Sequence, residues 1–306
     1  MNSIASFVSR SSSPLRCFCP VAFALFAYLL HMAPANAQEA GASQVSACVS
    51  PAMAQLLARE GNSVRVSAET QLAPQQAGVR ENEKGIAATR AGESLRTLQQ
   101  AHDWFEKGAR RGYAPAQVNL AVASLAGWGT PPNAGAARYW LREAANQGYA
   151  LAYYDLGVLY MNGCGVLQDY SEAFRYFEQG ANAGDAAAQM NLGYLYDQGL
   201  GVTRDRAAAA GWYRKAAEAG VAQAQFNLAD LYVRGEGIPR NDILAFAWFQ
   251  RAADQGEGRA KAMLDSLALQ LSPAELAEAK ARSRSLVPDA ARSAQVALVH
   301  GSDHRQ

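Results

Sequence analysis

The sequence predicts an all-α protein, specifically a right-handed α-solenoid of stacked helix-turn-helix repeats. Three observations support this fold class. The chain matches itself when shifted by 36 residues, with no insertion across four copies. Each copy holds two stretches with apolar residues at helical spacing, and glycines or N-capping residues bound these stretches. A single hairpin of this kind cannot bury both of its faces, so neighbouring copies must stack.

Residues 1–37 have the pattern of a secretory signal peptide. Arg10 and Arg16 precede an apolar run, and residues 34–37 place small side chains at the −3 and −1 positions of a cleavage site. The run is about a dozen residues long, whereas a membrane-spanning helix needs roughly 20. We therefore expect an exported protein with no integral membrane segment after cleavage. Its expected location is the periplasm, with secretion as the alternative.

Residues 38–96 do not fit the repeat period. Residues 51–60 predict one short amphipathic helix, and the rest of this N-terminal segment is polar and poorly patterned, so we expect it to be flexible. After cleavage the chain keeps two cysteines, Cys48 and Cys164. An oxidising compartment would allow them to pair. Nothing in their spacing requires a bond, so a disulfide and two free thiols both remain open.

The repeat array is predicted over residues 97–286, a capping helix included. Residues 101–112 match the second half of the next copy, so the array should start with an unpaired second helix near Leu98. In each full copy an Asn or Asp precedes the second helix, as an N-cap worth about 1 kcal/mol over alanine. These predicted caps are Asn133, Asp169, Asp205 and Asn241. An aromatic column should fill the space between crossing helices. It holds Trp140, Tyr176, Trp212 and Trp248.

Both helices of a copy are predicted to end at glycine. In the second full copy the first helix is expected at residues 150–161, broken by Gly163, because glycine adopts backbone conformations that other residues resist. The second helix of that copy should stop at Gly184. The alanine at position 152 and the leucine at position 156 are repeated at 36-residue intervals, and these two columns should form the buried stripe of each first helix.

The array is expected to end in a polar cap. Residues 258–271 repeat the first helix of a copy, and Ser272-Pro273 then starts a helix to about residue 285 that is rich in Ala, Glu, Lys and Arg. Such a helix suits the end of a solenoid, where one face meets solvent instead of another repeat. Residues 287–306 are expected to form a disordered tail.

These columns resemble the Sel1-like repeat family, which is related to tetratricopeptide repeats, and this chain looks like an exported bacterial member. The resemblance covers about residues 98–285 and is carried by AAAQMNLGYLY at 186–196, GLGV at 199–202 and WYRKAA at 212–217. It implies a scaffold or adaptor in envelope signalling or assembly, whose partner is a protein or a peptide.

Few residues point to an enzyme. Three histidines remain after cleavage and two of them lie in the expected tail, so histidine-based catalytic or metal sites are hard to assemble within the array. We expect no catalytic residue, no cofactor and no metal. The alternatives are a cell-wall or β-lactam-acting hydrolase and a secreted host-interaction factor. Cysteine-rich family members described as acting on β-lactams carry a cysteine pair in each repeat, whereas this chain has one cysteine in one repeat.

The charge gives no support for nucleic-acid binding. The formal net charge is +1, and loss of the two arginines of the leader, with no acid, changes it to −1. A nucleic-acid partner requires a concentrated basic surface.

The inner face of the first helices is the predicted binding surface. It carries an Asn/Asp column, and the positions three and seven residues further along are polar and varied. One hypothesis is that this column hydrogen-bonds an extended peptide, with Tyr194 as an apolar anchor. The alternative is a hydrogen-bond ladder between repeats. The predicted partner-binding residues are Asn119, Asp155, Asn162, Asn191, Tyr194, Gln198, Asn227, Asp230 and Arg234.

Overall fold

The computed structural model describes residues 74–92 and 94–286, and the predictions for the signal peptide, the 51–60 helix, Cys48 and the C-terminal tail lie outside these residues. The described residues form α-helices and no strand. In chain order the helices are α4 (Pro74–Arg90), α5 (Leu95–Arg110), α6 (Ala114–Ala126), α7 (Ala134–Asn146), α8 (Ala150–Asn162), α9 (Tyr170–Asn182), α10 (Ala186–Gln198), α11 (Arg206–Glu218), α12 (Ala222–Arg234), α13 (Asp242–Asp254), α14 (Gly258–Ala268) and α15 (Pro273–Ser285).

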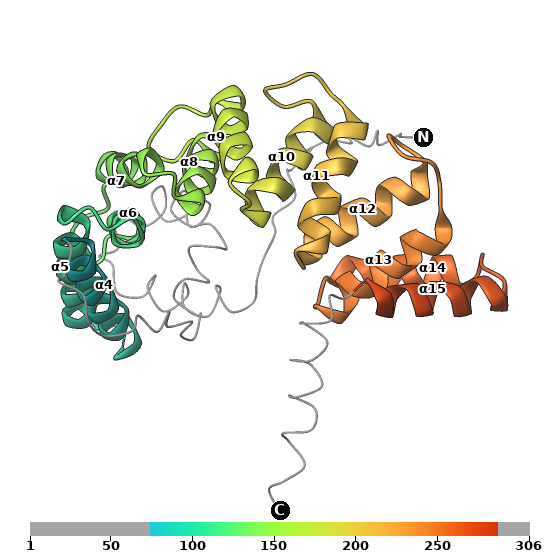
Figure 1. The fold of residues 1–306 in the computed structure, drawn as a ribbon, viewed down its shortest axis with the longest axis horizontal. Helices are drawn as coiled ribbons and strands as arrows, with labels where there is room; N and C mark the ends of the chain where they lie inside the picture. Colours follow the sequence, from blue (N-terminus) through green and yellow to red (C-terminus); the bar gives the residue numbers. More distant parts are fainter. Residues whose placement is uncertain (1–73, 93, 287–306) are drawn as a thin grey trace, which may run out of the picture.

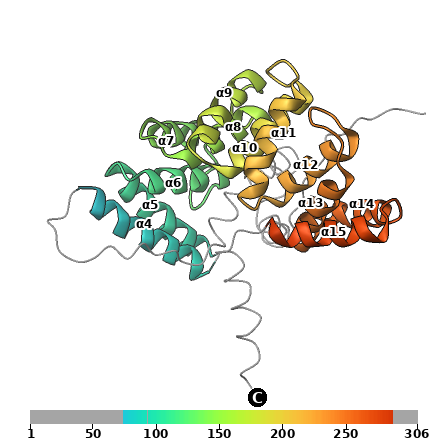
Figure 2. The same cartoon turned by 45° about the vertical axis from the view of Figure 1, so that its right-hand side comes forward.

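The helices follow one another along a curved array, which confirms the predicted α-solenoid (Figure 1). From α4 to α14 each helix packs against the helices next to it in the chain, and α15 packs against α13. In Figure 1, α6 and α8 lie on the inner side of the arc and α7 and α9 on its outer side. The view turned by 45° shows the two ends of the array, α4 with α5 and α14 with α15, well apart (Figure 2). No helix within the described ranges is long and apolar enough to cross a membrane.

The predicted N-caps and glycine breaks are confirmed. Asp205 shows the pattern of the second helices, since its Oδ1 accepts a hydrogen bond from the backbone N–H of Ala208 at 2.9 Å. Gly199 ends α10 in the left-handed region, with φ of 71°. Gly201 follows with φ of 69°, and a Cβ at that position would overlap the backbone of Tyr170 in the preceding repeat. The loop therefore needs glycine both for its backbone conformation and for its close approach to the neighbouring hairpin.

The core follows the predicted small and apolar columns. Ala152 and Leu156 are fully buried, as are their equivalents in the next two copies. In the aromatic column Tyr176 and Trp248 are buried, whereas Trp140 and Trp212 are half-buried. Alanine lets the crossing helices approach, and larger side chains fill the remaining space at interior packing density.

Helix α4 corrects two expectations. Residues 74–90 are helical instead of flexible, and α5 is paired, because α4 packs against it and against α6. Helix α4 keeps the 36-residue register: Gly85 lies two periods before Gly157. A Cβ on Gly85 would overlap the Phe105 ring, just as one on Gly157 would lie 2.6 Å from the Phe177 ring. Helix α4 is thus the first helix of an additional repeat.

The C-terminal cap is confirmed. Helix α15 begins with a capping box, in which Ser272 and Glu275 bond each other's backbone N–H groups. It packs against α13 and closes the end of the array. The helix before it, α14, ends at Ala268, three residues earlier than expected.

Cys164 is buried and disulfide-bonded, so the free-thiol alternative is wrong for this residue. It is the one cysteine among the described residues. Cys164 lies in the loop between α8 and α9.

Candidate interaction surfaces

Three of the predicted binding residues are buried in the array. Asp155 is fully buried, and Asn119 and Asn191 are nearly so. The Nδ2 of Asn119 donates to the Oδ1 of Asn82 on α4 at 2.8 Å, a bond between successive first helices. The Nδ2 of Asn191 donates to the carbonyl oxygen of Ala187 at 3.0 Å, one turn earlier in α10. The Asn119 bond joins two repeats, as in the alternative of a ladder between repeats, whereas the Asn191 bond stays within its own helix. Burial leaves all three side chains little surface for a partner to contact.

The other predicted residues are accessible. Tyr194 is 37% exposed, and Asn162, Gln198 and Arg234 are also at the surface. Asn227 and Asp230 are half-buried and belong to the same surface. The structure brings together the members on α10 and α12, whereas Asn162 lies one repeat earlier, at the end of α8.

A network of charged side chains joins α10, α11 and the end of α12, and we name it the acidic network. Arg206 lies 3.2 Å from Asp197 and 2.9 Å from Glu236. Arg234 lies 2.6 Å from Asp230 and 3.8 Å from the same Glu236. Three carboxylates therefore face two guanidinium groups, and a third guanidinium lies close by, because the Nε of Arg204 donates to the backbone carbonyl of Asp197 at 2.7 Å. The sequence pattern pointed to Asp230 and Arg234 as separate residues, and gave no sign of their ion pair or of the link through Glu236 to Arg206.

The acidic network lies beside a buried tyrosine. Asn227 hydrogen-bonds the hydroxyl of Tyr213, and Tyr194, Asp197 and Asp230 are near enough to act on that hydroxyl electrostatically. Burial is the main reason why the pKa of Tyr213 is raised. Burial also raises the pKa of Asp230, against the opposite effect of the Arg234 charge. Tyr194, Asn227 and Asp230 thus share one surface with a carboxylate that is incompletely solvated.

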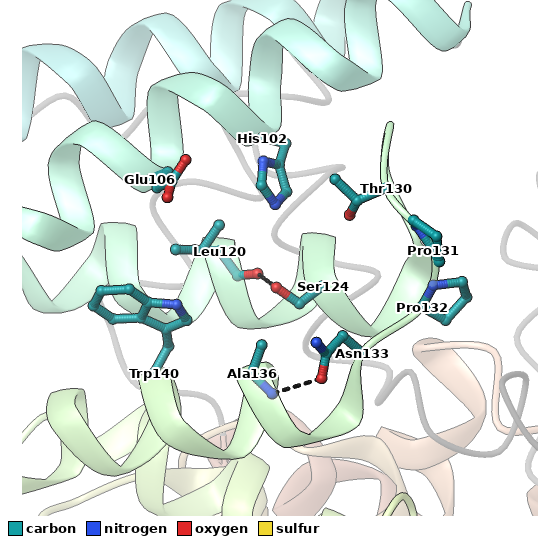
Figure 3. A pocket seen from close by; sticks show the side chains of 10 residues that line it. All are labelled: His102, Glu106, Leu120, Ser124, Thr130, Pro131, Pro132, Asn133, Ala136 and Trp140. Atoms are coloured by element: carbon teal, nitrogen blue, oxygen red, sulfur yellow. Dashed lines mark hydrogen bonds between the residues drawn. The ribbon is translucent and has the colours of Figure 1, made fainter.

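A second feature is a pocket of about 430 Å³ between α5, α6 and α7, which the sequence analysis did not anticipate (Figure 3). This volume lies in the range of about 300–1,000 Å³ that is usual for small-molecule sites. In Figure 3 the His102 ring points from α5 toward Ser124 on α6, with Trp140 on α7. The lining residues are His102, Glu106, Leu120, Ser124, Thr130, Pro131, Pro132, Asn133, Ala136 and Trp140.

The polar groups of the pocket are partly engaged. Ser124 donates from its Oγ to the carbonyl oxygen of Leu120 at 2.7 Å. Glu106 accepts from Arg110 through one carboxylate oxygen, Oε1, at 2.7 Å. The Nδ1 of His102 is buried without a hydrogen bond and lies 3.8 Å from the Asp103 carboxylate. The pocket therefore combines an apolar floor with a carboxylate and an imidazole. The signal in the sequence is Ser124, because the next three first helices have tyrosine at this position of the period.

The arrangement of His, Cys, Asp and Glu side chains in the described residues does not support a metal site. Within residues 74–92 and 94–286, no group of three or more His, Cys, Asp or Glu side chains is arranged to hold a metal ion.

Solved structures of other repeat proteins resemble this chain, and two of them share 30% or more of its sequence over the matched part. One is a protective antigen present in uropathogenic Escherichia coli strains displaying an SLR fold, with 32% identity and a TM-score of 0.58. The match covers 64% of this chain and 44% of that protein, so the chain spans less than half of its length. The other is a Sel1 repeat protein from Oxalobacter formigenes, with 30% identity, a TM-score of 0.57, and coverage of 68% of this chain and 86% of that one. No curated protein sequence matches.

The repeats themselves identify the family. The model of the Sel1 repeat matches residues 96–113, 114–149, 150–185, 186–221 and 222–257 without a gap. This stretch is more than half of the chain, and its boundaries coincide with the hairpins α6–α7, α8–α9, α10–α11 and α12–α13. The chain belongs to the Sel1 repeat family.

Proposed function

We propose that the protein is an exported, non-catalytic adaptor that binds a partner protein or peptide in envelope signalling or assembly. Sel1 repeat proteins generally mediate protein–protein interactions and are typically non-catalytic, which supports the class of role. The proposed site is the surface of α10–α12. The observation that carries it is Tyr194, an exposed aromatic side chain beside the acidic network.

The chemistry of this surface favours a basic partner segment. An exposed tyrosine provides a large contact area with few rotatable bonds, and tyrosine is enriched among the residues that dominate interface energies. The carboxylates of the acidic network can accept a hydrogen bond from a lysine or arginine in the partner, and such charged contacts favour orientation and association rate. Gln198 at the rim adds an amide that donates to Asp197 at 3.0 Å. An extended peptide with a basic residue beside an apolar one fits these groups.

Photo-crosslinking in cells tests this site. A benzophenone side chain at position 194 should give a discrete adduct, whereas the same group at position 139, which is 55% exposed on α7, should not. Once the partner is identified, Tyr194→Ala should weaken its binding by about tenfold or more, as for a dominant interface residue. Tyr139→Ala is the matched control and should leave affinity unchanged. An adduct from position 139 alone would contradict the proposed site.

Export to the periplasm is supported by two features. The leader pattern precedes a predicted cleavage site, and Cys164 is in a disulfide, a bond that persists in oxidising compartments. Cell fractionation and mass spectrometry should find a mature chain that begins at Gln38 in the periplasmic fraction. A chain with the leader intact in the cytosolic fraction would refute export.

Secretion is the second candidate location. The same leader would support it, and the mature chain would then accumulate in the culture medium.

A further inference from the structure

The pocket between α5, α6 and α7 lies where α6 has a smaller side chain than the three first helices that follow it. Three successive first helices carry a tyrosine near their ends, at the same position of the 36-residue period. These residues are Tyr160, Tyr196 and Tyr232. Helix α6 has Ser124 at this position, and Ser124 lines the pocket. The two terminal first helices, α4 and α14, have alanine at this position, Ala88 and Ala268. Where α8, α10 and α12 hold a phenol, α6 has only the short side chain of serine, and the cavity lies beside it.

The three tyrosines pack against second helices. The Tyr160 ring stacks on Tyr176 of its own repeat, with centroids 5.5 Å apart and planes at 17°. The Tyr196 ring meets Phe174 of the preceding repeat edge-on, at 5.2 Å. The hydroxyl of Tyr232 accepts a hydrogen bond from Arg214 of the preceding repeat at 3.3 Å.

The residues equivalent to these three contacts all line the pocket. Counting back in steps of 36, Trp140 stands in the place of Tyr176. His102 stands in the place of Phe174, and Glu106 in that of Arg214. The pocket is thus lined by an indole, an imidazole and a carboxylate at the positions that contact the tyrosine in later repeats.

We propose that this pocket binds the side chain of a tyrosine from a peptide partner. The phenol ring packs on Trp140, as Tyr160 packs on Tyr176, and aromatic pairs of this kind add stabilisation beyond their buried area. The hydroxyl donates to the Glu106 carboxylate. Glu106 is an acceptor where Arg214 is a donor, and this difference selects a phenol over a plain phenyl ring.

The occupant comes from another molecule. Residues 38–73 and 287–306 contain no Phe, Trp or Tyr, so after loss of the leader no aromatic side chain of this chain is left to fill the pocket from outside the described residues. The exposed Tyr139 of a second copy is a different source, which the test below distinguishes. This proposal rests on the proposed adaptor function in one respect, namely that the tyrosine belongs to a peptide partner.

The probes are p-cresol, which reproduces the tyrosine side chain, toluene, which lacks the hydroxyl, and N-acetyltyrosinamide, which adds the peptide backbone. Titrations of the mature protein follow the indole N–H signal of Trp140 by NMR, assigned with Trp140→Phe. We expect p-cresol to bind with a Kd on the order of millimolar, as for a fragment of this size, and toluene to bind several-fold more weakly. N-acetyltyrosinamide should bind at least as well as p-cresol.

Variants decide whether the pocket is the site. Ser124→Tyr should fill it, reduce p-cresol binding more than tenfold and raise the melting temperature. Ser124→Ala leaves the space open and should bind p-cresol like wild type. Glu106→Leu should weaken p-cresol binding and leave toluene binding unchanged. Tyr196→Ser, two interfaces away, is the matched control and should not change the Trp140 response.

Three results would overturn the proposal. Equal binding of p-cresol to wild type and Ser124→Tyr would place the probe elsewhere. If p-cresol bound and N-acetyltyrosinamide did not, the ligand would be a free phenol and not the side chain of a peptide. A wild-type dimer in sedimentation analysis that Tyr139→Ala and Ser124→Tyr both dissociate would make a second copy the occupant. None of these results depends on whether the α10–α12 surface binds a partner.

Discussion

Three glycines allow the same substitution to be measured in three surroundings. Gly237 has φ of 74°, and a Cβ there would overlap the backbone carbonyl group of Arg206 in the preceding repeat. Gly220 has φ of 94°, and a Cβ added to it would meet nothing within 4 Å. Gly211 is exposed within α11, and a Cβ there would also have open space around it. Replacing each by alanine therefore separates steric overlap, backbone strain and helix propensity.

The expected free energies differ in size and sign. The left-handed backbone costs an L-residue about 1–2 kcal/mol, so Gly220→Ala should lose that much stability. Gly237→Ala adds an overlap with rigid backbone, for which overpacking costs about 1–3 kcal/mol, so its loss should be about 2–5 kcal/mol. Gly211→Ala should gain about 0.5–1 kcal/mol, because glycine is a poor helix former.

Thermal melts followed by far-UV circular dichroism measure the order of the three variants. A domain of this size shifts by about 2–4 °C per kcal/mol, so Gly237→Ala and Gly220→Ala should be separable. Equal losses for these two variants would refute the reasoning, because the approach of the loop to Arg206 would then be unimportant. A loss in Gly211→Ala would refute the assignment of that position to an open helix surface.

Three further predictions follow from burial, charge and the disulfide. Phe177→Ala should lower the free energy of unfolding in urea by about 3–5 kcal/mol, because Phe177 is fully buried between α8, α9 and α10. Burial raises the pKa of Asp230 in the folded protein above its value in the unfolded chain. The protonated carboxyl therefore favours folding at a pH below the unfolded-state pKa, and this stabilisation is lost as the pH rises through the folded-state pKa. As the pH rises through this range, Asp230→Asn should therefore become more stable relative to wild type. Urea titrations of both proteins at each pH measure the difference in their free energies of unfolding. A difference that does not change with pH would contradict the raised pKa. A reductant should lower the melting temperature of wild type and leave Cys164→Ser unchanged, since a disulfide restricts the unfolded chain.

Features that depend on local chemistry could be predicted from the sequence. The cap at Asp205 requires only a side-chain oxygen ahead of a helical stripe, and the break at Gly199 only a residue that tolerates positive φ. Helix α15 could be predicted because Ser272, Pro273 and Glu275 form a strong local start signal. These elements are determined by their own residues and their immediate neighbours.

Features that depend on neighbouring repeats could not be predicted in this way. Helix α4 is polar and lacks the apolar stripe of the other first helices, and its only sequence signal is the small residues Gly78 and Gly85 in register. The burial of Asn119 follows from the presence of α4, so a prediction without that helix left Asn119 at the surface. The pocket arises from an absent side chain at Ser124, and a search for chemical motifs does not register absences.

The position of α4 also matters for how this protein is handled in the laboratory. Family boundaries begin at residue 96, and a fragment cut there would seem complete. Such a fragment would leave the ring of Phe105 on α5 without the cover that Gly85 and Ile86 of α4 provide. Bare apolar surface of this kind promotes self-association. Expression trials should therefore retain residues from 74 onward, and aggregation of shorter fragments would report the missing helix and not a defect of the repeats.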